Sequence, residues 1–182
     1  MKFKNLEMTG FKSFSEKTTI LIEKGLTGIV GPNGCGKSNI VEALRWCMGE
    51  NSAKSMRGSG MEDVIFSGTS NRPSKNISEV ALLLDNQEKS GPIQYKEFDE
   101  ILIKRKIEKE KGSKYYINDK EVRARDVQTF FADLSTGAHS PSLISQGRIG
   151  QLVTAKPIER KSILEEAACL LYTSPSPRDS RV

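Results

Sequence analysis

The stretch that most constrains the fold is GIVGPNGCGKSNIVEALRW, residues 28–46, where glycines, a lysine and a serine separate an apolar run from an amphipathic one. Gly31, Gly36, Lys37 and Ser38 match the pattern G-x-x-x-x-G-K-[ST]. Glycines let the backbone adopt positive φ and turn its N–H groups inward, which forms a nest for an anion. The stretch therefore predicts a loop that binds phosphate groups.

The residues on either side of this loop predict a strand and a helix. Residues 26–30, LTGIV, hold three apolar side chains and suit a short strand that runs directly into the loop. From Lys37 the apolar residues recur at helical spacing, and Gly49 marks the expected end. The N-terminus of this helix would add about half a positive charge beside the phosphates. Its apolar face is expected to hold Ile40, Val41, Leu44, Cys47 and Met48.

The chemistry of the loop points to a nucleoside triphosphate with its metal ion. Lys37 is placed to pair with the β and γ phosphates, and Ser38 to bind Mg²⁺ through its hydroxyl. A dinucleotide site of the Rossmann type needs G-x-G-x-x-G, whereas the glycines at 31, 34 and 36 give G-x-x-G-x-G. That spacing excludes the rival, and ATP with Mg²⁺ is the expected pair.

Composition sets the broad class. The 182 residues are 36% hydrophobic and 28% charged, as in a globular protein with a core, and the net charge of +5 is compatible with a polyanionic partner. No run approaches about 18 apolar residues and the N-terminus lacks an apolar signal stretch, so the cytosol is the expected compartment. Cys35, Cys47 and Cys169 have no C-x-x-C spacing, which argues against a zinc site or disulfide framework, and His139 has no partner at metal spacing.

The rest of the sequence predicts an α/β fold. Residues 50–76, rich in Gly, Ser and Asn, suggest a surface excursion broken by a short apolar piece at 64–66. In KRKIEKEK, residues 104–111, isoleucines and charges alternate, so half is expected in the core and half on a solvated face; contact with DNA phosphates is the alternative. The expected strands are 2–9, 18–23, 79–84, 101–107 and 115–117, and the expected helices are 124–134 and one that begins at Pro157.

Longer segments around the loop resemble one family, the bacterial SMC chromosome-partition proteins, above all those of alphaproteobacteria. The resemblance is to their N-terminal head segment and covers residues 1–168. It implies the N-terminal lobe of an ABC-type P-loop ATPase head, an α/β fold with a mixed sheet and the P-loop helix, truncated before the coiled coil. The segments that carry it are TGFKSF, GLTGIVGPNGCGKSNIVEALRWCMGE, SAKSMRGSGMEDVIFSGT, RARDVQTFFAD and SLISQGRIGQLV.

The resemblance also implies roles for single residues. Gln146, in LISQGR, corresponds to the Q-loop glutamine that helps to bind Mg²⁺ and to position the attacking water. Arg57, in SMRGSG, corresponds to an arginine that approaches the nucleotide and links DNA to ATP turnover. Ser38 and Gln146 would hold the metal. The implied nucleotide-binding set is Lys12, Ser13, Pro32, Asn33, Gly34, Cys35, Gly36, Lys37, Ser38, Asn39 and Arg57.

The implied function is an ATPase that organises DNA for chromosome segregation and condensation. Its partners would be its own C-terminal head lobe, a second SMC protomer, double-stranded DNA and accessory kleisin-type subunits, in the cytoplasm on the nucleoid and away from membranes. Heads of RecF- or RecN-type repair ATPases share the loop but not AKSMRGSGMEDVIFSGT, and they are the alternative. A self-contained nucleotide-binding module or small-molecule kinase would need a lid, and no second arginine cluster follows the loop.

Two features predict that this segment does not complete the reaction by itself. VALLLDN, residues 80–86, ends an apolar run on Asp85, but it lacks the following glutamate and precedes Gln146, the wrong order for the Walker B strand of the family. Asp85 is therefore expected at a strand end, and Walker B and the signature motif are expected from missing parts. After Ala168 the match gives way to CLLYTSPSPRDSRV, so residues 169–182 are expected to be a non-native, disordered tail.

Overall fold

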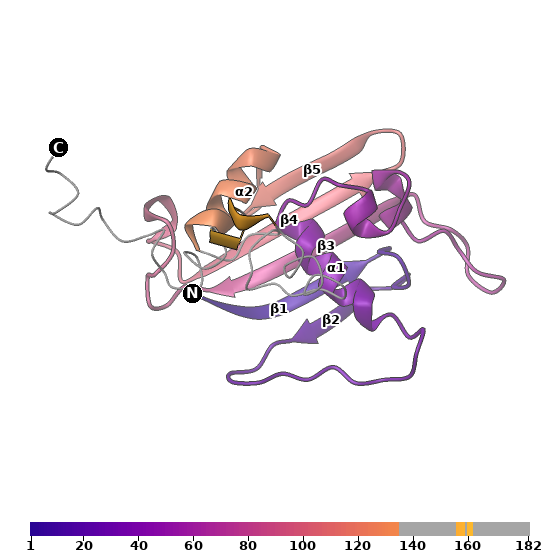
Figure 1. Cartoon of the computed structure of the whole chain (residues 1–182), viewed down its shortest axis with the longest axis horizontal. Helices are drawn as coiled ribbons and strands as arrows, with labels where there is room; N and C mark the ends of the chain where they lie inside the picture. The colour runs from indigo at the N-terminus through magenta and orange to yellow at the C-terminus, as the bar shows by residue number, and fades with distance from the viewer. Residues whose placement is uncertain (135–155, 159, 162–182) are drawn as a thin grey trace, which may run out of the picture. The chain divides into compact units, whose positions relative to one another are not determined.

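The computed structural model describes residues 1–134, 156–158, 160 and 161 (Figure 1). The chain divides into two units, Met1–His139 and Ser140–Val182. In the second unit, the residues from Pro157 that the structure describes are helical, and the Arg160 N–H donates to the Lys156 carbonyl at 3.0 Å. The expected helix start at Pro157 is confirmed. No helix within the described ranges is long and apolar enough to cross a membrane.

The first unit is built on one antiparallel sheet. Its strands lie in the order β2-β1-β3-β4-β5-β6, and each neighbouring pair is antiparallel. The α/β class is confirmed, whereas the expected mixed sheet is wrong for the part of the chain that the structure describes, because no parallel pair occurs there. The strands are β1 (Lys2–Thr9), β2 (Thr18–Leu21), β3 (Ile77–Asp85), β4 (Glu100–Glu108), β5 (Gly112–Ile117) and β6 (Lys120–Val122).

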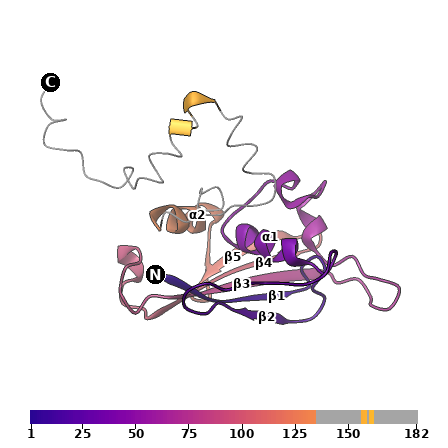
Figure 2. The ribbon, with the colours of Figure 1, turned by 60° about the horizontal axis from the view of Figure 1, so that its bottom comes forward.

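The helices cover one face of this sheet, as Figure 2 shows. Helix α1 (Lys37–Cys47) packs on β3 and β4, and helix α2 (Ala124–Asp133) packs on β5. The core lies between the helices and the sheet, because alternate side chains of each strand point into it. The 3₁₀ turns η1 (Lys54–Met56), η2 (Met61–Val64) and η3 (Ile93–Tyr95) lie in the connections.

The buried face of α1 differs from the expected one. Val41 and Leu44 are only half-buried, and the helix is turned so that Trp46 is fully buried. The Trp46 ring lies 5.5 Å from the ring of Phe11, which follows β1. The largest apolar side chain of the helix therefore decides which face meets the sheet. The residues of α1 that are buried are Ile40, Glu42, Ala43, Trp46 and Cys47.

The expected strand at residues 26–30 is wrong. This stretch has no strand conformation, and Leu26 and Val30 are 99% and 94% exposed. A strand needs a neighbour that satisfies its backbone N–H and C=O groups. Among the described residues, the nearby edge strand β2 pairs with β1 alone. The phosphate loop is therefore preceded by an open loop, seen in Figure 1 between β2 and α1.

Candidate functional site

The loop of residues 31–36 leads directly into α1. Gly34 and Gly36 have φ values of 82° and 93°, and Gly36 is the left-handed N-cap of the helix. A Cβ atom on Gly36 would lie 2.5 Å from the Oγ of Ser13. Both the conformation and this close approach favour glycine at position 36. The loop thus makes the turn that the sequence predicts, with the N-terminus of α1 behind it.

The Lys37 side chain curls back over the loop. Its Nζ donates to the carbonyl of Gly31 at 2.6 Å and to that of Pro32 at 2.5 Å, and it lies 3.7 Å from Cys35 Sγ. The ammonium group is therefore held by acceptors that a phosphate oxygen could replace. Pro32, Asn33 and the other residues of the loop before Gly36 are exposed, so the loop is open to a ligand.

The residues present fit a bound Mg²⁺–nucleotide pair. Ser38 is exposed on the first turn of α1, immediately after Lys37, so its hydroxyl is available as a metal oxygen. Mg²⁺ is commonly held by one or two protein oxygens together with phosphate oxygens and water. Within the described residues, no group of three or more His, Cys, Asp or Glu side chains could hold a metal by itself.

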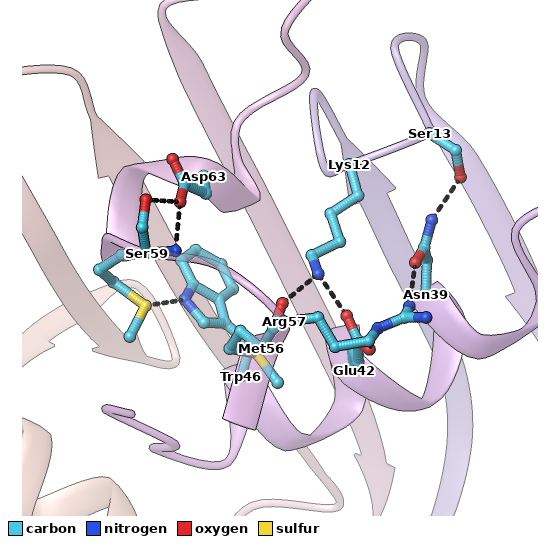
Figure 3. A network of polar contacts seen from close by, with 10 residues as sticks. Lys12, Ser13, Asn39, Glu42, Trp46, Met56, Arg57, Ser59 and Asp63 are labelled. Carbon is cyan, nitrogen blue, oxygen red and sulfur yellow. Dashed lines mark hydrogen bonds and ion pairs between the residues drawn. The ribbon is translucent and has the colours of Figure 1, made fainter. Parts of the chain in front are cut away.

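Residues that are far apart in the sequence meet beside the loop, as Figure 3 shows. Asn39 Nδ2 donates to Ser13 Oγ at 2.9 Å, and Arg57 Nη2 donates to Asn39 Oδ1 at 2.8 Å. The amide of Asn39 thus joins the turn after β1 to the segment after η1. Because Asn39 lies in the first turn of α1, both segments are fixed against the end of the helix that carries the phosphate loop.

A buried carboxylate holds two of the cations in this network. Glu42 Oε2 accepts from Lys12 Nζ at 2.5 Å, and Glu42 Oε1 pairs with Arg57 Nε. Lys12 Nζ also donates to the carbonyl of Met56, the residue before Arg57. The side chains of Glu42 and Lys12 are 9% and 13% exposed. Charges removed from water to this extent need partners, and these two satisfy one another.

The segment that carries Arg57 is anchored by Asp63. Asp63 Oδ2 accepts from the backbone N–H groups of Ser59 and Gly60 at 2.6 and 2.9 Å, and from the Ser59 hydroxyl at 2.9 Å. These hydrogen bonds, that of Gly60 first, hold the pKa of the Asp63 carboxyl below its ordinary value. The segment is therefore held by an ionised carboxylate at neutral pH.

Comparison with known proteins assigns the family. The RecF/RecN/SMC N terminal domain family matches residues 2–147. The chain belongs to this family. The Chromosome partition protein Smc of Cereibacter sphaeroides is 57% identical over 168 residues, which are 92% of this chain and 15% of that protein. The chain thus spans about 15% of the length of the curated relatives it matches, and those relatives are Smc proteins rather than RecF or RecN.

Solved structures of SMC heads share the fold. One of them is an SMC ATPase that was studied for its ATP-driven dimerization and DNA-stimulated activation. Its TM-score is 0.81 at 32% identity, and the match covers 92% of this chain and 99% of that chain. The Smc head of Pyrococcus furiosus, bound to the C-terminal domain of ScpA, has a TM-score of 0.84 at 32% identity. The match covers 91% of this chain and 41% of that chain. The resemblance to SMC heads that the sequence predicts is confirmed.

The structure of this SMC-family chain brings together most of the predicted site residues but not all of them. Lys12, Ser13, Asn39 and Arg57 converge on α1 beside the phosphate loop. Gln146 lies outside the described residues, and so do His139 and Cys169. Sequence reasoning missed Glu42, and no sequence signal singles it out, because it is one charged residue among many and its partner Lys12 is 30 residues away.

Proposed function

We propose that this chain is the ATP-binding half of an SMC head. The observation that carries the proposal is the loop itself: Gly34 and Gly36 at positive φ, with the Lys37 ammonium inside the curve and α1 directly behind. A triphosphate would replace the two carbonyls that now accept from Lys37. The N–H groups of the loop and the α1 N-terminus would then face the same anion.

The neighbouring residues suit the remaining parts of the ligand. The hydroxyl of Ser38 and, in the proposal, the side-chain oxygen of Gln146 would hold Mg²⁺, which when bound neutralises phosphate charge. Gln146 would also position the attacking water. Arg57 and Lys12 add positive charge beside the loop, and Arg57 is 57% exposed, so it can contact a ligand without leaving Glu42. Through Arg57, bound DNA would stimulate turnover.

Hydrolysis and DNA organisation belong to the assembled protein. We propose that residues 1–168 form the N-terminal lobe, which joins its own C-terminal lobe and a second SMC protomer on double-stranded DNA. A kleisin-type subunit is a further partner, because a solved Smc head is bound to ScpA. The exposed Leu26 and Val30 before the phosphate loop offer an apolar edge for the missing lobe. The assembly would act in the cytoplasm, in chromosome segregation and condensation.

Calorimetry with Mg²⁺–ATP tests the binding step. Lys37→Ala removes a charge-assisted contact of about 1.5–3 kcal/mol, so the affinity of the chain for ATP should fall about tenfold or more. Lys24→Ala is the matched control, because Lys24 is an exposed lysine in the open loop that precedes the phosphate loop. Equal ATP affinity for wild type and Lys37→Ala would contradict the proposal, provided that both proteins are folded.

A further inference from the structure

The carboxylate of Glu42 connects two cations that come from different connections of the fold. Lys12 follows β1 and Arg57 follows η1, and the two are paired with different oxygens of the same carboxylate. We propose that Glu42 is a positioning residue that holds Arg57 toward the phosphate loop. This inference rests on the proposed function, because it concerns how the same site meets the phosphates of ATP.

The geometry fixes Arg57 at two points on one side of α1. Its Nε pairs with Glu42 Oε1, and its Nη2 donates to Asn39 Oδ1 at 2.8 Å. Residues 39 and 42 are three positions apart, so they are neighbours on the helix surface. Asn39 also holds Ser13, which lies against Gly36. Two side chains, those of Asn39 and Ser13, therefore link the guanidinium to the last glycine of the loop. Figure 3 shows the contacts among Arg57, Asn39 and Ser13.

The backbone at both cations supports a functional role. Lys12 and Arg57 have φ values of 46° and 53°, which is the left-handed region that side chains other than glycine enter at a cost. Such conformations cluster at ligand-binding sites when the surrounding structure holds them in place. Here the contacts that hold them include the Lys12–Glu42 pair and the bond from Lys12 Nζ to the Met56 carbonyl.

Positioning and charge predict opposite effects of Glu42 on ATP binding. A carboxylate near a phosphate site repels the ligand, so charge alone predicts that Glu42→Gln tightens binding of ATP. If Glu42 holds Arg57 in place, the same substitution frees the guanidinium and weakens binding through the lost Arg57 contact. The sign of the change in affinity therefore distinguishes a positioning residue from a nearby charge.

A double-mutant cycle read by calorimetry with Mg²⁺–ATP tests the inference. Glu42→Gln in the otherwise unchanged chain should weaken ATP binding about threefold or more, since an exposed guanidinium contact is worth about that much. In the Arg57→Ala background the same substitution should leave the affinity unchanged or improve it. Weakening in both backgrounds indicates a folding role, and tightening in both indicates charge alone. Either result would overturn the inference.

Glu50→Gln is the matched control. Glu50 is a second buried carboxylate, 2% exposed in its side chain, and it pairs with Arg45 at 2.9 Å at the far end of α1. Its loss should lower the thermal midpoint at least as much as Glu42→Gln does, with ATP affinity unchanged within about twofold. An effect of Glu50→Gln on ATP equal to that of Glu42→Gln overturns the inference.

The cycle also separates this inference from the proposed function. If Lys37→Ala weakens ATP binding but Glu42→Gln shows no dependence on Arg57, the phosphate loop binds ATP and Glu42 has no positioning role. If the folded wild-type chain does not bind Mg²⁺–ATP at all, the proposed function fails and the inference fails with it.

Discussion

The guanidinium carbon of Arg105 lies 4.4 Å from the ring centre of Trp46, and the Nη1 of the same guanidinium donates to the Trp46 carbonyl at 2.9 Å. The same guanidinium carbon lies 4.6 Å from the ring centre of Tyr115. A second bond from Nη1 reaches the Glu50 carbonyl at 2.6 Å. Arg105 thus satisfies carbonyls at the C-terminal end of α1 from inside the core. Burial lowers its pKa to about 10, so the cation persists at neutral pH.

Arg105→Lys should destabilise the chain by about 2 kcal/mol or more, because lysine lacks the second nitrogen, Nη2, which donates to Asn51 Oδ1 and Ser113 Oγ at 3.3 Å, and lacks the planar guanidinium that stacks on aromatic rings. Urea unfolding followed by the fluorescence of Trp46 measures this change. Lys106→Ala is the control, since Lys106 is the next residue of β4 and its side chain lies on the opposite face of the sheet. A loss for Arg105→Lys no larger than that of the control would contradict the role of Arg105.

Gly36→Ala should cost more stability than Gly25→Ala. The two glycines have nearly equal φ, 93° and 91°, but a Cβ on Gly25 meets nothing within 4 Å whereas one on Gly36 meets Ser13 Oγ. The shared strain is about 1 kcal/mol, and displacing Ser13 also breaks its bond with Asn39, about 0.5–1.5 kcal/mol more. Thermal unfolding of both variants checks this order. Ser13→Ala removes the same bond. The double variant Ser13→Ala, Gly36→Ala should therefore lose less stability than the sum of the losses of the two single variants.

The sequence predicts the elements whose cause is local. The apolar run in β3, the alternation in β4 and the apolar spacing of α2 place these elements close to the observed bounds. The prediction of a strand at residues 26–30 is wrong because strand pairing is not local. The exposed apolar residues there have no neighbouring strand among the described residues. Arg105 departs from the alternation of β4, which predicts charged side chains on the solvated face. Its burial depends on Trp46, which is 59 residues away in the sequence.

The same distinction separates the parts of the candidate site. The glycines, Lys37 and Ser38 are a local motif, so their spacing alone predicts the loop. Glu42 is one charge among many in a chain that is 28% charged, and its partner Lys12 is 30 residues away. Nothing in the spacing of single residues indicates that pairing, which exists only once the turn after β1 lies against α1.

The two described cysteines should differ in reactivity. Cys35 is exposed in the phosphate loop, whereas Cys47 is buried and its burial raises the pKa of the thiol to about 12. Iodoacetamide at pH 8 with peptide mapping should therefore label Cys35 and leave Cys47 unmodified until urea is added. Mg²⁺–ATP should slow labelling of Cys35. Labelling of Cys47 at the rate of Cys35 in the folded chain would refute the assignment.

The raised pKa of Cys47 also predicts a loss of stability in alkali. The unfolded thiol ionises near its ordinary pKa of 9.0, while the folded thiol stays protonated up to about 12. The stabilisation from this group is complete below about pH 9 and is lost as the pH rises toward the folded value. Cys47→Ala should therefore reduce the loss of stability that the chain shows above about pH 9. Urea midpoints measured between pH 8 and 11 check this.

The carboxylate at the end of β3 is badly placed for catalysis at the phosphate loop. Asp85 pairs in register with Lys2 at the start of β1, whereas Lys12 and Ser13 follow the other end of that strand. Eight residues of β1 separate the two ends, which is about 25 Å of extended chain. Asp85 Oδ1 accepts from the Gln87 N–H at 2.9 Å. The expectation that Asp85 is a strand end is confirmed.

The chain should therefore bind ATP but release phosphate at least about tenfold more slowly than it does with its C-terminal lobe, because positioning and charge stabilisation carry most of phosphoryl-transfer catalysis. The measurement is phosphate release by the chain alone and after the C-terminal head lobe of the Cereibacter sphaeroides relative is added. A solved SMC ATPase chain covered to 99% by this one supports the use of separate lobes. Lys37→Ala, which should abolish the gain, is the control. Comparable turnover with and without the second lobe would mean that this chain carries its own catalytic base, and the half-site proposal would then be wrong.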